Sequence, residues 1–376
     1  MTTGNSVYEV YVSDPFGLRL GDASDFVSLK YSRVVNTWST AVLVLPGHFD
    51  TSLLRIPDGR LEIWRKPAPS TTLVLDTETT WLMKKPVWER DAKGNQSITV
   101  EADTPLSLLK EPGRFVDYAA GSAQALQTDF ADDMIKVIAR QNIGGSAIAS
   151  RDLSAYISIA PDLSLAPSTT KAFAWRDCLK AMQEIAATSA EQGVYLAFDI
   201  VAPTPSTYAL RTYVGWRGTD HRSPNGANPV IIGPEFGNMG ECELSLDYRN
   251  EITYAVAGGR GDGADRLLGD AVDSVRVGAS PFGWREKFVN ATQYTTTTGL
   301  DAEAEAAVRG GRPRLTFRGR LLDVPGCRYG VHWQWGDYVT VQAFGQSFDC
   351  RIDAITVTVQ NGRESIDAWL RSDTIP

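Results

Sequence analysis

The sequence contains few of the residues on which metal sites and nucleophilic catalysis depend. Its only histidines are His48, His221 and His332, and none has a second metal ligand at helix or strand spacing. A Gly-x-Ser-x-Gly nucleophile elbow is absent, and no cysteine lies in a recognisable protease context. We therefore expect no catalytic residue, no cofactor-binding residue and no metal ligand.

The four cysteines lack the close spacing of a zinc site or a redox pair. We interpret Cys178, Cys242, Cys327 and Cys350 as reduced core thiols. Cys327 and Cys350 could fall on neighbouring strands, but a reducing compartment would keep even a well-placed pair open.

Long apolar runs and an excess of positive charge are also missing. The longest aliphatic run, residues 41–45, is far shorter than the roughly 18 residues that span a bilayer, and no N-terminal secretion signal is visible. The 37 basic and 45 acidic residues give a net charge of -8, which argues against stable nucleic-acid binding through counterion release. A hydrophobic content of 43% excludes disorder over most of the 376 residues, and this length predicts about two or three domains.

Alternation of apolar and polar residues predicts strands over about the first 110 residues. Leu29, Tyr31 and Arg33 alternate with polar neighbours, and the apolar residues 41–45 end at the turn that begins with Pro46. Six or so short strands separated by turn signals indicate a small barrel or sandwich.

The period changes to that of helices from about residue 115 to 200. Phe130, Met134 and Ile138 lie at helical spacing, a second helix is centred on Met182, and residues 194–198 are typical of a buried strand. This part of the chain is therefore predicted to be mixed α/β.

Strand patterns return after residue 205 and continue, with one interruption, to the end of the chain. The interruption at 257–310 holds a glycine-rich stretch and a weakly amphipathic segment that predicts a short helix. The dipeptide Asn361-Gly362 predicts a tight hairpin between the last two strands.

Two groups of residues invite a chemical interpretation, and each also has a plainer one. Trp333 and Trp335 could form a sugar-stacking platform, but we favour aromatic packing at a strand end. Asp199, Asp220 and Glu241 are possible carboxylates of a glycosidase, which needs two carboxyls about 5–10 Å apart. Each of these three is better explained as a turn or solvated residue.

Several sequence blocks are similar to those of one protein family. Trp38 precedes an apolar strand that ends in Leu45-Pro46, although the family's usual glycine between them is lacking. The more specific blocks are GWRGTDHR at 215–222, NPVII at 228–232, EFGN at 235–238, DYRN at 247–250, VAGGRG at 256–261, WGDYV at 335–339 and IDAI at 352–355. Together they resemble the minor tail proteins of long-tailed bacteriophages that are related to the baseplate hub.

The resemblance implies an α+β, β-dominated fold with two β-barrel-like hub domains flanking a mixed α/β segment. We place the first β-barrel-like domain at 1–114 and the mixed α/β domain at 115–205. The second β-barrel-like domain then comprises 206–256 and 311–376, with a loop and short-helix insertion at 257–310.

The resemblance also implies a function at the tip of the tail. Three chains with two barrel domains each would form a ring that adapts the hexameric tail tube to a threefold tip and lets DNA pass. We therefore expect a homotrimer with only transient DNA passage. The expected partners are the distal tail protein or tail tube ring, a central tail fibre or tip protein, and the tape measure protein.

The expected location is the distal end of the virion tail, after assembly in the host cytoplasm. Because the chain ends soon after the second β segment, we expect a structural protein and no enzymatic domain. The alternatives are a receptor- or carbohydrate-binding tail protein and a glycosidase or peptidase.

Overall fold

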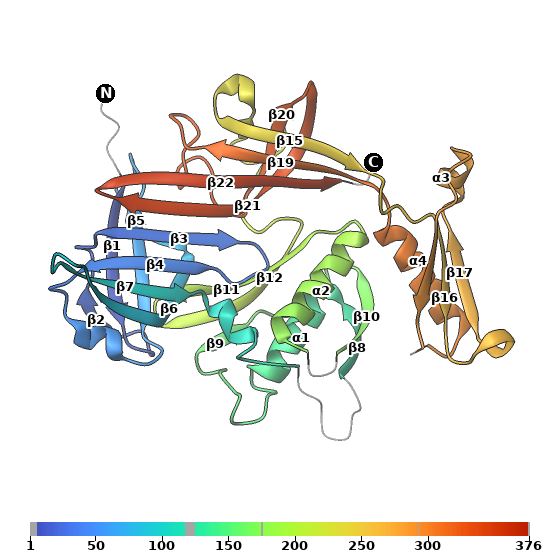
Figure 1. Cartoon of the computed structure of the whole chain (residues 1–376), viewed down its shortest axis with the longest axis horizontal. Coiled ribbons are helices and arrows are strands. Elements are labelled where there is room, and N and C mark those ends of the chain that lie inside the picture. The colour runs from blue at the N-terminus through green and yellow to red at the C-terminus, as the bar shows by residue number, and fades with distance from the viewer. Residues whose placement is uncertain (1–5, 117–124, 174–175, 293, 375–376) are drawn as a thin grey trace. The chain divides into compact units, whose positions relative to one another are not determined.

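Strands dominate the fold, as the sequence predicts (Figure 1). The computed structural model describes residues 6–116, 125–173, 176–292 and 294–374. The N-terminal segment contributes β1 (Val7–Ser13), β2 (Arg19–Asp22), β3 (Ser28–Val34), β4 (Thr40–Pro46), β5 (Arg60–Lys66), β6 (Val74–Arg90) and β7 (Gln96–Asp103).

These strands form because every second residue is apolar and finds a buried face. On β4, Ala41, Leu43 and Leu45 are fully buried while the residues between them are half-buried. β4 lies between β3 and β7, with which it pairs antiparallel. The alternation that predicted strands here is confirmed.

The mixed α/β part has two helices that pack on a three-stranded sheet (Figure 1). Met134 and Ile138 of the first helix are buried in one core with Met182 and Ile185 of the second, so both predicted helices are confirmed. The elements are β8 (Ala125–Phe130), α1 (Ala131–Asn142), β9 (Ile157–Ile159), β10 (Ser168–Phe173), α2 (Cys178–Glu191), β11 (Leu196–Thr204) and β12 (Thr207–Val214).

The second β segment continues the sheet of the first. Its strands are β13 (Asp220–His221), β14 (Ile231–Ile232), β15 (Met239–Asp247), β19 (Arg314–Leu322), β20 (Tyr338–Ala343), β21 (Gln346–Gln360) and β22 (Arg363–Thr374). β21 pairs antiparallel with β3 (Figure 1). In this register Val357 lies opposite Tyr31. The predicted hairpin joins β21 to β22, with Asn361 and Gly362 at positive φ.

All these strands belong to one 14-stranded sheet, whose main path runs β15-β19-β22-β21-β3-β4-β7-β6-β5-β1-β2. Among the described strands no pairing joins the two ends of this path, so neither β segment is closed into a barrel by its own hydrogen bonds. The two expected barrel-like modules are thus pieces of a shared sheet.

The chain divides into two compact units. The larger contains Met1–Ala190, Val194–Cys242 and Gly319–Arg371, and the smaller contains Glu191–Gly193, Glu243–Arg318 and Ser372–Pro376. The domain boundaries that we placed from the sequence stay a prediction.

The smaller unit has its own three-stranded sheet with a helix on one face. Its elements are β16 (Tyr254–Gly258), β17 (Leu268–Val272), α3 (Ser274–Gly278), β18 (Glu286–Asn290) and α4 (Thr297–Gly310). Ala255 and Ala257 of the sheet pack against Leu300, Ala304 and Val308 of α4. Residues 257–310, expected as a loop and a short helix, therefore also supply two strands, because small alanines let the helix approach the sheet closely.

Candidate functional site

Four side chains from distant parts of the larger unit meet in a buried group, which we call the arginine cluster: Arg33, Asp199, Arg217 and Trp335. Asp199 Oδ2 accepts a hydrogen bond from Arg33 Nη2 at 2.5 Å and another from Arg217 Nη2 at 2.9 Å. The exposed fraction of the side chain is 2% for Arg33, 1% for Asp199 and 6% for Arg217. One buried carboxylate thus ties β3 and β11 to the loop that follows β12.

Trp335 completes the arginine cluster with its ring. The guanidinium carbons of Arg33 and Arg217 lie 4.4 Å and 3.9 Å from the centroid of the Trp335 ring. Its Nε1 donates to the carbonyl oxygen of Asp353 at 3.2 Å. Cation–π contacts gain strength when both partners are removed from water, so this geometry stabilises two buried cations around one indole.

Charge balance inside the arginine cluster is incomplete without Glu78. Two guanidinium groups share the single carboxylate of Asp199, and Arg217 Nη2 also contacts Glu78 Oε2 at 3.2 Å. Burial lowers the pKa of Arg33, and for Arg217 the nearby carboxylates outweigh the effect of burial and raise the pKa. Both arginines stay charged, so removal of Asp199 would leave uncompensated buried cations.

A polar cavity of about 330 Å³ lies beside the arginine cluster. Thr77 and Glu78, which line it, both have positive φ, at 54° and 51°. Two consecutive non-glycine residues in the left-handed region store backbone strain, and the pairing of β6 with β5 at Leu75 and Thr80 holds the chain on either side of them. The lining residues are Thr77, Glu78, Arg211, Tyr213, Arg217, Gly218, Thr219, Tyr329, Gln334, Trp335 and Asp337.

Asp337, which lines this cavity, and its neighbour His221 are held by structural contacts. Asp337 accepts from the backbone N–H of Thr219 at 2.7 Å and of Gln334 at 2.6 Å. His221 faces Asp337 with Nε2 at 3.4 Å and the carbonyl oxygen of Ala227 with Nδ1. These contacts fix the loops between β12 and β20.

A second buried network, which we call the tyrosine cluster, joins the N-terminal and C-terminal strands. Asp76 accepts from the hydroxyls of Tyr31 at 2.6 Å and Tyr329 at 3.0 Å. Arg65 binds both carboxylate oxygens of Glu364 on β22, at 2.8 Å and 2.9 Å. Burial raises the pKa of Asp76 and outweighs the opposing effects of Arg65 and the two hydroxyls.

Trp333 and Trp335, the two residues of the possible sugar platform, are both buried in the structure. The two residues are only 1% and 4% exposed, so they do not form an open aromatic platform on the surface. Trp333 Nε1 donates to the carbonyl oxygen of Cys327 at 3.1 Å, as a buried indole requires. The packing interpretation of these tryptophans is confirmed.

The three possible catalytic carboxylates have different environments. Asp199 is the buried centre of the arginine cluster, and Asp220 forms a two-bonded ion pair with Arg222 at 2.9 Å. Glu241 is exposed on β15. The interpretation as a turn or solvated residue is therefore wrong for Asp199, which is 1% exposed on β11, because the two arginines supply the charge that lets it be buried. The expectation of no catalytic residue stays a prediction.

Cys327 and Cys350 are buried thiols in the structure. Burial raises the pKa of Cys327 to about 11, so this thiol is unreactive at neutral pH. In the described part of the chain, no three histidine, cysteine or carboxylate side chains come together as a metal site would require. No helix among the described residues has the length and hydropathy needed to cross a membrane.

The comparison with protein families decides the relationship that the sequence blocks suggested. The model of the Siphovirus ReqiPepy6 Gp37-like protein family matches residues 9–369. The chain belongs to this family of siphovirus tail proteins. No curated protein matches it in sequence.

Solved structures of other tail proteins share the fold of this family member over nearly its whole length. A 43 kDa tail protein of prophage MuSo2 from Shewanella oneidensis aligns with a TM-score of 0.55 at 10% identity, covering 97% of this chain and 98% of that one. A tail protein from Neisseria meningitidis MC58 gives 0.53 at 13% identity, with 98% and 97% covered. Prophage tail protein gp18 from Listeria monocytogenes EGD-e gives 0.52 at 12% identity, with 97% and 94% covered.

Sequence reasoning missed both buried clusters, although one signal in the sequence indicated the arginine cluster. Arg33 lies in register with Leu29 and Tyr31 on the alternating face of β3, and all three are buried. An arginine on an apolar strand face requires a buried anion. The sequence could not show that Asp199 supplies it, because that pairing depends on tertiary structure.

Proposed function

We propose that this tail protein is a structural baseplate hub at the distal end of a long-tailed phage tail. In this proposal three copies form a ring, and two β segments per chain present six similar elements to the tail tube. The observation that carries it is the β21–β3 pairing, which joins the two β segments of each chain side by side. Membership of a siphovirus tail family and the shared fold with other tail proteins support the same assignment.

The proposed partners follow from a position between tube and tip. One face of the ring would contact the distal tail protein or the tail tube ring, and the other a central fibre or tip protein, with the tape measure protein in the channel. Closure of such a ring makes the contacts between copies heterologous. DNA would pass through the ring only during ejection.

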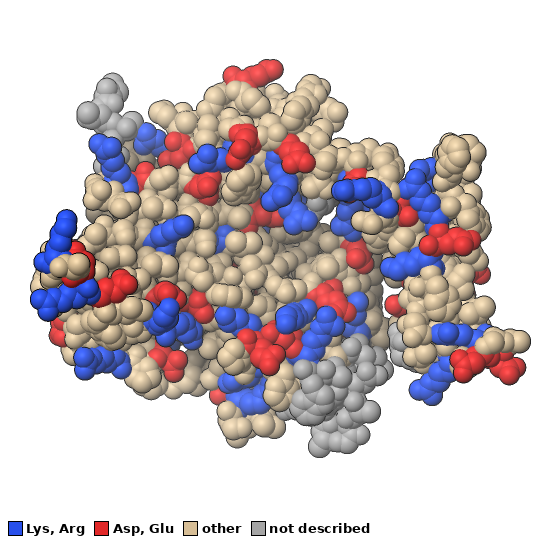
Figure 2. Space-filling model, viewed as in Figure 1, with Lys and Arg blue, Asp and Glu red and all other residues tan. Residues whose placement is uncertain are grey.

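The acidic balance of the chain suits a channel that does not hold DNA. A net charge of -8 opposes counterion-release binding, and we propose that acidic residues partly line the lumen. On the face drawn in Figure 2, acidic and basic residues are interspersed and no basic stripe is visible. A basic channel lining in the assembled ring would contradict this part of the proposal.

Asp199 and Asp220 form ion pairs with arginines, and Trp333 and Trp335 are buried. These structural roles support a function without catalysis. We expect the purified chain to release no fragments from peptidoglycan. Cleavage that disappears when one carboxylate is replaced would overturn this expectation.

Electron cryomicroscopy of isolated tails tests the proposal directly. The expected result is three copies of the chain in a ring at the distal end of the tail. Six copies, a position along the tube, or absence from the tail would each overturn it.

A further inference from the structure

A second cavity adjoins the polar cavity beside the arginine cluster. Both cavities lie within the larger unit, and Arg211 of β12 and Glu78 of β6 line both of them. The second cavity has a volume of about 210 Å³. Its other lining side chains are all apolar or aromatic: Trp64, Leu75, Val201, Ala202, Pro203 and Pro205. A ligand that fills both cavities therefore needs a polar part and an apolar part.

Arg211 is a charged group without a partner at the junction of the two cavities. It is exposed on β12, and within the described residues its guanidinium makes no hydrogen bond or ion pair. The other arginine of the polar cavity, Arg217, already contacts Asp199 and Glu78 at 2.9 Å and 3.2 Å. Asp337 accepts two backbone hydrogen bonds. The junction therefore offers an unpaired, accessible cation to a ligand.

The backbone of β6 is distorted where it reaches this junction. In the pairing of β6 with β5, residues 76–79 lie opposite Ile63 alone, so β6 bulges there. The strained residues Thr77 and Glu78 belong to this bulge. Bulges and strained backbone are concentrated beside binding sites, where they aim side chains that a regular strand would direct elsewhere.

The charges at the junction favour a carboxylate as the group that pairs with Arg211. A guanidinium binds carboxylates and phosphates through two parallel hydrogen bonds. The carboxylates of Glu78 and Asp337 line the same cavity and repel a phosphate, with up to two negative charges, more strongly than a singly charged carboxylate. The ligand is thus expected to carry Asp or Glu chemistry.

The rest of the polar cavity suits peptide groups. Its volume of about 330 Å³ is far more than one carboxylate fills, given that a water molecule takes about 30 Å³. Gln334 lines the cavity, is exposed, and has a side-chain amide without a hydrogen-bond partner in the part of the chain that the structure describes. A carboxamide both donates and accepts, as a peptide group requires of its partner.

We propose that the two cavities form one binding site for a peptide segment in which Asp or Glu lies next to a large apolar residue. The carboxylate pairs with Arg211, the peptide groups of the segment occupy the polar cavity with Gln334, and the apolar side chain fills the second cavity. The charge that selects this ligand is exposed and unpaired in the chain itself. The inference does not depend on the proposed function, because it concerns binding by the isolated chain.

A peptide array probed with the purified chain tests the chemistry of the ligand. The array carries hexapeptides with a central Leu-Glu pair in a Gly-Ser background, and matched peptides with Leu-Gln or Ala-Glu instead. Binding should fall roughly tenfold from Leu-Glu to Leu-Gln, because a charge-assisted hydrogen bond is lost. It should also fall for Ala-Glu, which leaves the apolar cavity unfilled. Equal binding of the Glu and Gln peptides, or binding of none, overturns the proposal.

Substitution of Arg211 tests the location of the site. Arg211→Gln should weaken binding of a fluorescein-labelled Leu-Glu hexapeptide roughly tenfold, measured by fluorescence anisotropy. The melting temperature should stay unchanged, because Arg211 has no partner to lose. The matched control is Arg318→Gln, at an exposed arginine of β19 outside both cavities, and it should bind as the wild type does. Equal losses in the two variants would indicate unspecific attraction and overturn the site.

Gln334→Glu tests whether the carboxylate lies in the polar cavity. The added negative charge should weaken the Leu-Glu peptide several-fold and leave the Leu-Gln peptide unaffected. Gln342→Glu makes the same change at an exposed glutamine of β20 outside both cavities, and it should have no effect on either peptide. Unchanged Leu-Glu binding in Gln334→Glu would contradict the assignment.

Competition with hexanoate separates a peptide site from a site for a free acid. Hexanoate has a carboxylate and an apolar chain but no peptide group, so it should displace the labelled peptide only at concentrations far above those of unlabelled peptide. Displacement at equal concentrations would overturn the peptide assignment. These measurements use the isolated chain, so their failure leaves the hub proposal standing, and a wrong position or copy number in tails overturns the hub proposal alone.

Discussion

The hydroxyl of Tyr329 donates a hydrogen bond to the carboxylate of Asp76 at 3.0 Å, although 253 residues separate them in the sequence. Both groups are buried, and the bond joins the N-terminal strands to the loop between β19 and β20. The tyrosine cluster therefore supplies polar contacts between the two β segments.

Tyr329→Phe should lower the free energy of unfolding by about 1–3 kcal/mol, because a buried carboxylate loses one of its two hydroxyl donors. Urea denaturation of the purified protein measures this. Tyr156→Phe, at a ring that is 43% exposed, is the matched control and should change stability by less than about 0.5 kcal/mol. Equal effects of the two changes would contradict the role of the tyrosine cluster.

Asp199→Asn should be much more damaging, with a loss of about 3–5 kcal/mol. The change leaves Arg33 and Arg217 buried without their shared anion. Glu101→Gln removes an ion pair of exposed side chains and should cost only about 0–1 kcal/mol. A small effect of Asp199→Asn would show that the arginine cluster is solvated in solution.

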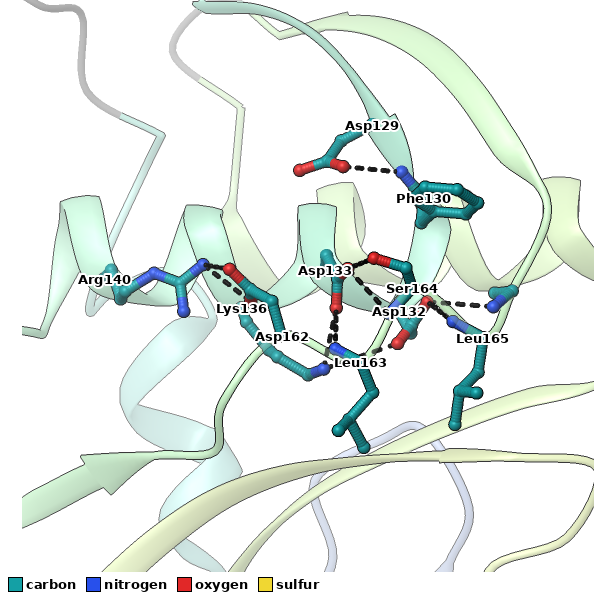
Figure 3. A network of polar contacts seen from close by, with 11 residues as sticks. Asp129, Phe130, Asp132, Asp133, Lys136, Arg140, Asp162, Leu163, Ser164 and Leu165 are labelled. Atoms are coloured by element: carbon teal, nitrogen blue, oxygen red, sulfur yellow. Dashed lines mark hydrogen bonds and ion pairs between the residues drawn. The ribbon is translucent and has the colours of Figure 1, made fainter.

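The buried ion pairs of Lys136 with Asp132 and Asp133, at the start of α1, predict a pH dependence with a definite sign (Figure 3). Burial alone would raise the pKa of Asp133, but hydrogen bonds from Lys136, Leu163 and Ser164 outweigh it and lower the pKa to about 2. Because this pKa lies below that of the unfolded chain, Asp133 stabilises the fold above about pH 4. That stabilisation is lost as the pH falls towards 2.

Asp133→Asn should therefore be less stable than the wild type at pH 7, by about 1–3 kcal/mol. Its free energy of unfolding should also fall less steeply than that of the wild type between about pH 4 and pH 2. Denaturation curves at a series of pH values compare the two proteins. Parallel pH profiles would show that Asp133 is not held by these hydrogen bonds.

Trp335→Ala should destabilise the larger unit by about 3–5 kcal/mol, as expected for a large aromatic side chain lost from a packed core. Trp88→Ala, at a side chain that is 47% exposed, serves as the comparison and should have a far smaller effect. A glycan array probed with both proteins should show no difference. Sugar binding that depends on Trp335 would revive the carbohydrate-binding alternative.

The local patterns of the sequence predicted the elements well where one physical signal governs them. Alternation placed β3 and β4, helical spacing around Met134 and Met182 placed α1 and α2, and Asn361-Gly362 placed the last hairpin. These signals act over a few residues, so they are visible without the fold.

The contacts that join the elements were not predictable in the same way. Nothing near Arg33 in the sequence indicates Asp199. The backbone of residues 163–166 is likewise held by the carboxylates of Asp132 and Asp133, which precede it by about thirty residues. The strands within residues 257–310 were not predicted, because alanine and glycine give only a weak pattern of apolar and polar residues. In the structure, Ala255, Ala257 and Ala304 form a close contact between helix and sheet.

The adjacency of β3 and β21 also constrains how this protein is made. During synthesis, β3 emerges early from the ribosome but must wait for more than three hundred residues before its neighbour is translated. Until then its unpaired edge is available to other nascent chains, and long-range pairing of this kind is slow. A host chaperone that covers this edge would raise the yield of folded protein, whereas a premature stop anywhere before β21 would leave an aggregation-prone fragment.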